Sequence, residues 1–434
     1  MPSKYQRPSR LLVAGLAAAL ATTVAAAPVS GTANASDRAH HGKTDTYVAA
    51  WDAIGTQAFT ASALSPAEGH IIFGYAGIAV YDAVVAVRHK YEPFAIRTRA
   101  PRGASPEAAV VAAAHRIYEH YLPLQEAAIL DPAYDESLAT IPDGKAKDDG
   151  VAVGLRVANA LIALRADDGF RADVGYTPPS PALPGDWVPT MPAPPGGTYL
   201  PHMQPFSLES ADRFRPAGPP SLGSKRWARD YNEVKKLGSA TSTVRKDWQT
   251  TAALFWGEAP VQQGHLALRG VIDQHDLDVV QAARMMAMVS VAYADGMIAC
   301  FDAKYFYEFW RPITAIRAGD TDGNAKTVGD PTWMHLLPGT PNHPDYPSAH
   351  SCITPAGGAA LAEFLGTRRI DLTIPSLTGL GDRHFDTVKE LATEVGNARI
   401  WGGIHFRTAV EDGIRIARKT AAEVLDDNFE RTRH

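Results

Sequence analysis

Apolar residues recur at intervals of three and four positions along most of this chain, and alanine fills many of the positions between them. That interval matches the turn of an amphipathic helix. It predicts ten helical segments, at 45–64, 67–88, 105–122, 145–168, 225–237, 245–256, 276–309, 354–365, 386–398 and 409–428. No segment alternates convincingly between polar and apolar residues, so no β-strand is predicted. We therefore expect a mainly α protein whose helices form bundles, two packed four-helix bundles in all.

The helical period disappears between residues 176 and 220. This stretch contains 13 prolines and aromatic residues such as Trp187, Tyr199 and Phe206. It is either a linker or a structured segment that wraps over the helices. The aromatic residues favour the wrap, because flexible linkers seldom carry apolar anchors. The expected domains are an N-terminal helical region at 36–175, a Pro/Gly-rich wrap at 176–224 and a C-terminal helical bundle at 225–434.

The first 35 residues have the features of a secretory signal peptide. Three basic residues within the first ten precede an apolar run over 11–27, and Ala33-Asn34-Ala35 follows as a small-residue cleavage site. The run of 17 residues falls short of the ~20 strongly apolar residues of a membrane-spanning helix. We therefore expect secretion with cleavage near Ala35. No later segment resembles a membrane span.

Charge and cysteine content limit the partners of the mature chain. Removal of the three basic leader residues changes the formal net charge from −5 to −8. A net acidic protein is a poor candidate for binding nucleic acid or anionic membrane surfaces. Cys300 and Cys352 are the two cysteines, too few for a disulfide-built scaffold. In an oxidising compartment they could form one disulfide; the alternative is two buried free thiols.

The segment "KYFYEFWRP" carries two cations among aromatic residues. Lys304 and Arg311 are seven positions apart, so on one helix they would project from the same face. Pro312 disfavours helical geometry at Arg311 and predicts that the helix ends there. The aromatic neighbours suggest burial, and buried cations need an anion. The alternative is a surface salt-bridge face.

The segment "YPSAH" predicts the start of a helix at Pro347 and Ser348. The free N–H groups of a helix N-terminus, with a serine hydroxyl beside them, can bind an anion. His350 lies in the first turn, where it could contact that anion. Taken alone, a histidine in this position is more often structural.

The segment "NARIWGGIHFR" places Arg399 six residues before His405. A straight helix would point these two side chains in different directions. Gly402 and Gly403 permit a break that could turn both toward one site. The alternative is a helix–helix turn with incidental polar residues.

Together these segments offer three cations, a helix N-terminus and two histidines, a set suited to a tetrahedral oxyanion. The order K-x6-R-P, P-S-x-H and R-x5-H resembles the three-part signature shared by vanadium-dependent haloperoxidases and type-2 phosphatidic-acid phosphatases. The stretches "GDWVPTMPAPP", "LFWGEAP" and "FDAKYFYEFWRPITAIRAGDTDGN" look like the soluble, exported bacterial haloperoxidase-like branch.

The resemblance implies a role for each site residue. Five residues would hold the anion through side chains or a backbone N–H: Lys304, Arg311, Ser348, Ala349 and Arg399. His405 would bind vanadium in a peroxidase, or attack phosphorus in a phosphatase. His350 would be the acid–base group, and His343 would line the pocket and tune halide preference.

Three positions depart from the signature. Ala349 stands where glycine is usual, Ala398 where serine is common, and Ala409 where an acid follows the last histidine by four residues. Such an acid orients the imidazole and raises its basicity. Glu411, Asp412 or a backbone carbonyl could replace it.

The resemblance implies an enzyme that oxidises halide with hydrogen peroxide, with vanadate as cofactor bound to His405. The first alternative is an acid phosphatase that hydrolyses a phosphomonoester through a phosphohistidine, with phosphate in the same site. The second is a non-catalytic oxyanion-binding homologue, for which the missing acid at Ala409 is the best support.

Overall fold

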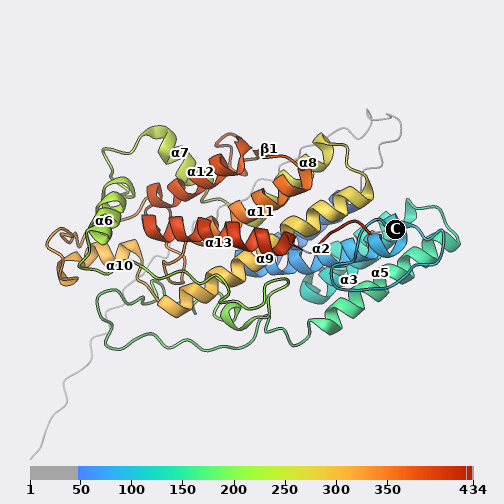
Figure 1. The fold of residues 1–434 in the computed structure, drawn as a ribbon, viewed down its shortest axis with the longest axis horizontal. Helices are drawn as coiled ribbons and strands as arrows, with labels where there is room; N and C mark the ends of the chain where they lie inside the picture. Colours follow the sequence, from blue (N-terminus) through green and yellow to red (C-terminus); the bar gives the residue numbers. More distant parts are fainter. Residues whose placement is uncertain (1–46, 427, 433–434) are drawn as a thin grey trace, which may run out of the picture. The chain divides into compact units, whose positions relative to one another are not determined.

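A computed structural model describes residues 47–426 and 428–432 (Figure 1). The signal peptide expected at 1–35 lies outside the described residues. Within them, regular structure consists of thirteen α-helices, two short strands and a few single turns of 3₁₀ or π helix. The prediction of a mainly α protein is confirmed.

The N-terminal helices form one packed group. Its members are α1 (Tyr47–Ala61), α2 (Pro66–Arg88), α3 (Pro106–Tyr121), α4 (Asp131–Ala139) and α5 (Lys145–Leu164). The start of α2 is fixed by a capping box in which Ser65 and Glu68 satisfy each other's backbone N–H groups. α2 packs on α3, and α3 packs on α5. Gly154 permits that last contact, since a Cβ there would lie 2.4 Å from the Ala109 carbonyl oxygen.

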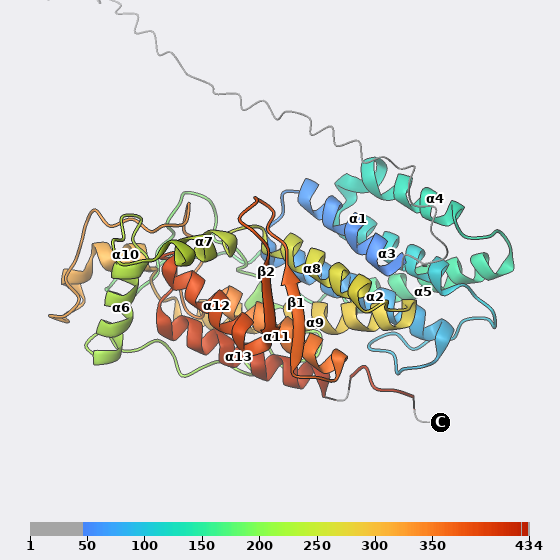
Figure 2. The same ribbon diagram turned by 90° about the horizontal axis from the view of Figure 1, so that it is seen from above.

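The C-terminal helices form a second group, except that α8 (Pro260–Gln274) packs on α1 and α2 of the first group and on strand β1 (Arg369–Ile374). They are α6 (Lys225–Leu237), α7 (Asp247–Phe255), α8 (Pro260–Gln274), α9 (Val279–Tyr307), α10 (Pro312–Arg317), α11 (Ala349–Leu365), α12 (Val388–Trp401) and α13 (Arg407–Leu425). α9 packs on α11 and α13, and α11 also packs on α12. α9 contacts α2 as well, so it joins the two groups (Figures 1 and 2). Its residues are buried over most of its length, as this position requires.

A β-hairpin interrupts the helices between α11 and α12. Strand β1 (Arg369–Ile374) pairs antiparallel with β2 (Arg383–Thr387) (Figure 2). β1 alternates exposed and buried residues along its six positions. The expectation that the chain has no strand is therefore wrong here, because so short an alternation does not stand out from the surrounding helical pattern.

The segment 176–220 has almost no regular structure, apart from a 3₁₀ turn at Leu200–His202. It is nevertheless held against α9 by hydrogen bonds. The buried Asp295 side chain accepts the backbone N–H groups of residues 206, 207 and 208 at 2.7–3.1 Å. Arg215 donates two hydrogen bonds of 2.7 Å to Asp302. We call this segment the wrap.

By length and composition, α2 and α9 would each be able to cross a membrane. In the fold, however, 89% and 94% of their most apolar windows are buried inside the protein. Both therefore serve as core helices in the described part of the chain.

Candidate oxyanion site

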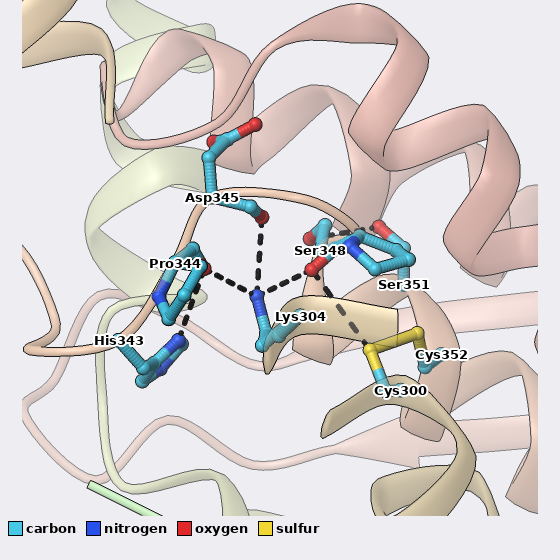
Figure 3. Close-up of a disulfide and its surroundings, with 9 residues drawn as sticks. Cys300, Lys304, His343, Pro344, Asp345, Ser348, Ser351 and Cys352 are labelled. Atoms are coloured by element: carbon cyan, nitrogen blue, oxygen red, sulfur yellow. Dashed lines mark hydrogen bonds between the residues drawn. A yellow bond between two sulfur atoms is a disulfide. The ribbon is translucent and has the colours of Figure 1, made fainter. Parts of the chain in front are cut away.

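The loop before α11 is the centre of the site, and Lys304 in the last turn of α9 holds it. Lys304 is fully buried. Its Nζ donates to the carbonyl oxygens of Pro344 at 2.8 Å and Asp345 at 3.1 Å, and also to that of Pro347 (Figure 3). Three backbone carbonyls thus use the three N–H donors of the ammonium group. Lys304 therefore fixes the loop, and its ammonium group places a buried positive charge next to the loop backbone.

Arg311 does not share a helical face with Lys304, so that prediction is wrong. α9 ends at Tyr307, because Glu308 adopts a left-handed conformation with φ of 44°. Arg311 lies in extended backbone, φ −81° and ψ 155°, directly before α10. Pro312 accounts for this conformation, since it disfavours helical geometry in the preceding residue.

The turn at the end of α9 nevertheless brings Arg311 to the same loop. Its guanidinium is fully buried and donates to the carbonyl oxygens of His343 at 2.7 Å and Ile404 at 2.8 Å. Its Nη2 lies 3.0 Å from Nδ1 of His343, and its Nη1 lies 3.3 Å from Nε2 of His405. Arg311 thus links the loop before α11 to the turn before α13.

Arg399 and His405 reach the site from either side of a glycine turn, as the sequence predicts. Arg399 is in the last turn of α12, and the chain reverses at Gly403, which has φ of 79°. Arg399 is 4% exposed and its Nη1 donates to the carbonyl oxygen of Trp256. Its Nε is buried without a hydrogen-bond partner among the described residues.

The acid that orients His405 is Asp345. His405 Nδ1 lies 2.9 Å from Asp345 Oδ1, and both side chains are almost fully buried. The Arg311 N–H that faces Nε2 requires a lone pair there, so Nδ1 carries the proton. Burial, followed by the charges of Arg311, Lys304 and Arg399, lowers the pKa of His405 well below its usual value. His405 is therefore a neutral imidazole whose Nε2 keeps an unprotonated lone pair.

Asp345 is not among the residues predicted from the sequence, and the predicted substitutes for the acid missing at Ala409 are wrong. Glu411 pairs with Arg226 at 2.7 Å. Asp412 accepts a 2.6 Å hydrogen bond from Tyr346. The one available signal was the position of Asp345 in "PDYPSAH", three residues before Ser348.

The N-terminus of α11 supplies the next part of the site. Ser348 is the N-cap residue and is fully buried; its Oγ accepts a 3.1 Å hydrogen bond from Ser351. His350 follows in the first turn, with Nε2 buried and without a partner among the described residues. Burial, and then Arg399, lowers the pKa of His350 well below its usual value. A Cys300–Cys352 disulfide ties α11 to α9 beside these residues (Figure 3).

These elements border a cavity of about 400 Å³. Five of the predicted site residues line it: His343, Ala349, His350, Arg399 and His405. The other three, Lys304, Arg311 and Ser348, are fully buried around its lining. The structure thus brings all eight residues together, five in the cavity lining and three buried next to it.

The charges of the cluster fit an oxyanion. Lys304, Arg311 and Arg399 are buried basic side chains, and Asp345 is the one acidic side chain hydrogen-bonded to the cluster within the described ranges. Burial lowers the pKa of Lys304 well below its usual value and, against the charges of Arg311 and Lys304, raises the pKa of Asp345 to about 7. Burial lowers the pKa of Arg311 to about 10 and that of Arg399 to about 9. Uncompensated buried cations are costly, and an anion offsets the cost. The unpartnered Nε of Arg399 and Nε2 of His350 supply polar atoms for vanadate or phosphate.

Three comparisons with known proteins found similar sequences and folds. The family description "VCPO second helical-bundle domain" matches residues 284–432. Vanadium chloroperoxidase of Curvularia inaequalis is 26% identical over 364 residues; the match covers 63% of this chain and 59% of that protein. The chain thus spans less than two thirds of the length of this curated relative.

Solved structures share the fold. A bacterial vanadium-dependent iodoperoxidase superposes with a TM-score of 0.78 at 24% identity, covering 91% of this chain and 99% of the other. An apo-form bacterial vanadium-dependent chloroperoxidase superposes with a TM-score of 0.67 at 18% identity, covering 84% and 95%. The fold is therefore similar over nearly the whole of these two proteins.

Proposed function

Since this chain belongs to the vanadium haloperoxidase superfamily, we propose that it is a vanadate-dependent haloperoxidase that oxidises halide with hydrogen peroxide. The observation that supports this proposal is the buried cluster of three cations and one carboxylate beside the neutral His405. A cluster of this kind suits an oxyanion that also takes one nitrogen ligand.

The protein's own residues have separate tasks in this proposal. His405 offers the Nε2 lone pair as ligand, and Asp345 holds its Nδ1 proton and ring orientation. Arg399 and Arg311 neutralise charge on the oxyanion, and Lys304 fixes the loop that carries Asp345. Bound vanadate supplies a Lewis acid that activates peroxide without a change of metal oxidation state.

His350 is the proposed proton carrier. It lines the cavity at the N-terminus of α11, and its Nε2 is buried without a hydrogen-bond partner among the described residues. An oxyanion beside it raises the imidazole pKa, because opposite charge favours the protonated form. His350 can then give a proton to an oxygen in the cavity and take one back.

Bromination of monochlorodimedone by the full chain tests this function. We expect activity that requires orthovanadate, peroxide and bromide together, and that falls at least 100-fold in His405→Ala and in His350→Ala. His384→Gln, on the exposed hairpin, is the matched control. Absence of vanadate-dependent halogenation with bromide, chloride and iodide would overturn the proposal.

The second candidate is a phosphatase that uses the same residues. The Asp345–His405 hydrogen bond favours it, since a neutral, oriented imidazole is also a nucleophile for phosphorus. Hydrolysis of p-nitrophenyl phosphate that is lost in His405→Ala and inhibited by vanadate would support this reading. Binding of vanadate with no turnover in either assay would support a non-catalytic oxyanion binder.

We further propose that the enzyme acts outside the cytoplasm. The leader at residues 1–35 supports export, and so does the Cys300–Cys352 disulfide, since such bonds persist mainly in oxidising compartments. N-terminal sequencing of the secreted protein should give a start just after Ala35. Retention of the full leader in the cell would contradict export.

A further inference from the structure

The cavity is larger than its anion end requires. An oxyanion of five heavy atoms fills on the order of 100 Å³, whereas the cavity measures about 400 Å³. A space of this size suits a small organic molecule. Halide and peroxide do not need it.

Most of the additional space has apolar walls. Phe301 and Met297 of α9 and Ile353 of α11 form part of the lining, and Met191 and Pro194 of the wrap form another part. Tyr293 adds a rigid surface, because its ring lies directly against the backbone of Gly357. A Cβ at Gly357 would lie 2.1 Å from that ring. Flat aromatic and thioether surfaces of this kind favour an aromatic guest.

His70, on α2, is a polar group in this lining to which the oxyanion chemistry gives no role. It is 4% exposed, and its Nδ1 is buried without a hydrogen-bond partner among the described residues. Its ring meets Tyr293 edge-on at 5.2 Å. Burial, and secondarily His265, lowers the pKa of His70 to about 3, so it is neutral. A buried polar atom left unpaired is costly unless a ligand satisfies it.

Three other polar side chains of the cavity already have partners. Ser65 bonds to Glu68, Gln263 donates to Glu258 at 2.8 Å, and Asn342 donates to a wrap carbonyl at 2.6 Å. Unlike these three residues, His70 lines the cavity with a ring nitrogen that has no hydrogen-bond partner among the described residues.

We propose that this cavity binds a neutral, small aromatic molecule with one hydroxyl or N–H group, that His70 is its polar anchor, and that this molecule accepts the oxidised halogen. The proposal deepens the proposed function and rests on it for the halogenation step. In that step the hypohalous acid gives its halogen to a ring carbon. A C–X bond forms and a C–H bond breaks, the ring loses two electrons to the halogen, and the released proton joins the hydroxide as water.

Binding to the full chain, measured by calorimetry without vanadate or peroxide, tests the site directly. Phenol and toluene are the probes, since they differ by one hydroxyl group. We expect phenol to bind the wild type more tightly than toluene. His70→Leu should weaken phenol binding about three- to ten-fold, the value of one neutral hydrogen bond, and should leave toluene binding unchanged. His70→Asn should restore most of the phenol affinity through its amide.

Vanadate affinity of His70→Leu within two-fold of wild type would show that the anion end is intact. Equal affinity of the wild type for phenol and toluene, or binding of neither, would overturn the proposal. So would equal phenol affinity in wild type and His70→Leu. The binding measurement does not depend on turnover. If phenol binding depends on His70 but the protein does not halogenate, the proposed enzyme function is rejected and the binding site stands.

Discussion

Asp345 and His405 form a buried pair in which the carboxylate fixes both the tautomer and the orientation of the imidazole. Without that hydrogen bond, the imidazole proton could sit on Nε2, which would then have no free lone pair. The carboxylate is fixed in turn by its own backbone, since Lys304 donates to the Asp345 carbonyl oxygen. The tautomer and orientation of His405 thus depend on two residues that are distant from it in sequence.

We expect Asp345→Ala to weaken vanadate binding by about 10- to 100-fold, the usual effect of removing the partner of a ligating histidine. Asp345→Asn should weaken vanadate binding less, because its amide oxygen can still accept a hydrogen bond from Nδ1 of His405. Asp412→Asn is the control, since Asp412 bonds to Tyr346 and not to His405. Equal losses in Asp345→Ala and Asp412→Asn, by calorimetry with orthovanadate, would contradict this role.

Proton uptake should accompany anion binding. Burial, with Arg399 next, holds the pKa of His350 well below its usual value in the free site. A bound dianion raises that pKa, so the complex holds more protons than the free protein, and affinity must increase as pH falls. Sulfate is a suitable probe because it stays dianionic over this range.

We therefore expect the dissociation constant of sulfate to fall as pH is lowered from 8 to 5. Each histidine that takes up a proton on binding can contribute up to about a ten-fold decrease per pH unit. Calorimetry in buffers of different ionisation enthalpy measures the proton uptake. The slope should be smaller in His350→Ala and unchanged in His384→Gln. A pH-independent affinity in the wild type would show that the histidines do not respond to the anion.

At the scale of elements, the disulfide joins the two helices that carry Lys304 and His350. Cys300 lies one turn before Lys304 on α9, and Cys352 lies in the first turn of α11 (Figure 3). The sequence left open whether these thiols pair; in the structure they do. The bond closes a loop of 52 residues that includes the whole segment 343–348.

Replacement of both cysteines by serine should lower the free energy of unfolding by about 4 kcal/mol, from the chain entropy of a loop this long. It should also weaken vanadate binding, because the loop carbonyls that hold Lys304 are then less restrained. Urea denaturation and vanadate calorimetry measure the two effects. Reduction of the wild type should reproduce both, and a reduced protein with unchanged stability would contradict the argument.

The elements also show what the sequence could not predict. The helical period predicted ten of the thirteen described helices and missed α4, α8 and α10, while the ordered motifs predicted the eight residues that the structure brings together. The end of α9 was misplaced, because the left-handed Glu308 has no sequence signal comparable to a glycine. Asp345 was missed for another reason. It reaches His405 by tertiary packing, which the spacing within a motif does not encode.

At the scale of the whole molecule, the cavity is a product of both helix groups. His70 comes from α2, the residues of the candidate oxyanion site come from the C-terminal part of the chain, and α9 packs on both α2 and α11. The wrap contributes Met191 and is held to α9 through Asp295. Separate unfolding of the N-terminal helices would therefore expose α9 and open the cavity.

We accordingly expect one calorimetric unfolding transition for the full chain, and a single upward shift of that transition with vanadate. At a vanadate concentration of 100 times the dissociation constant, the stabilisation should be about 2.7 kcal/mol. His405→Ala should show no comparable shift at the same concentration, which separates site binding from general salt effects. The contrary result is two unfolding transitions, with vanadate raising the temperature of one of them and not the other. It would mean that the N-terminal helices fold independently and that α2 is not coupled to the anion site.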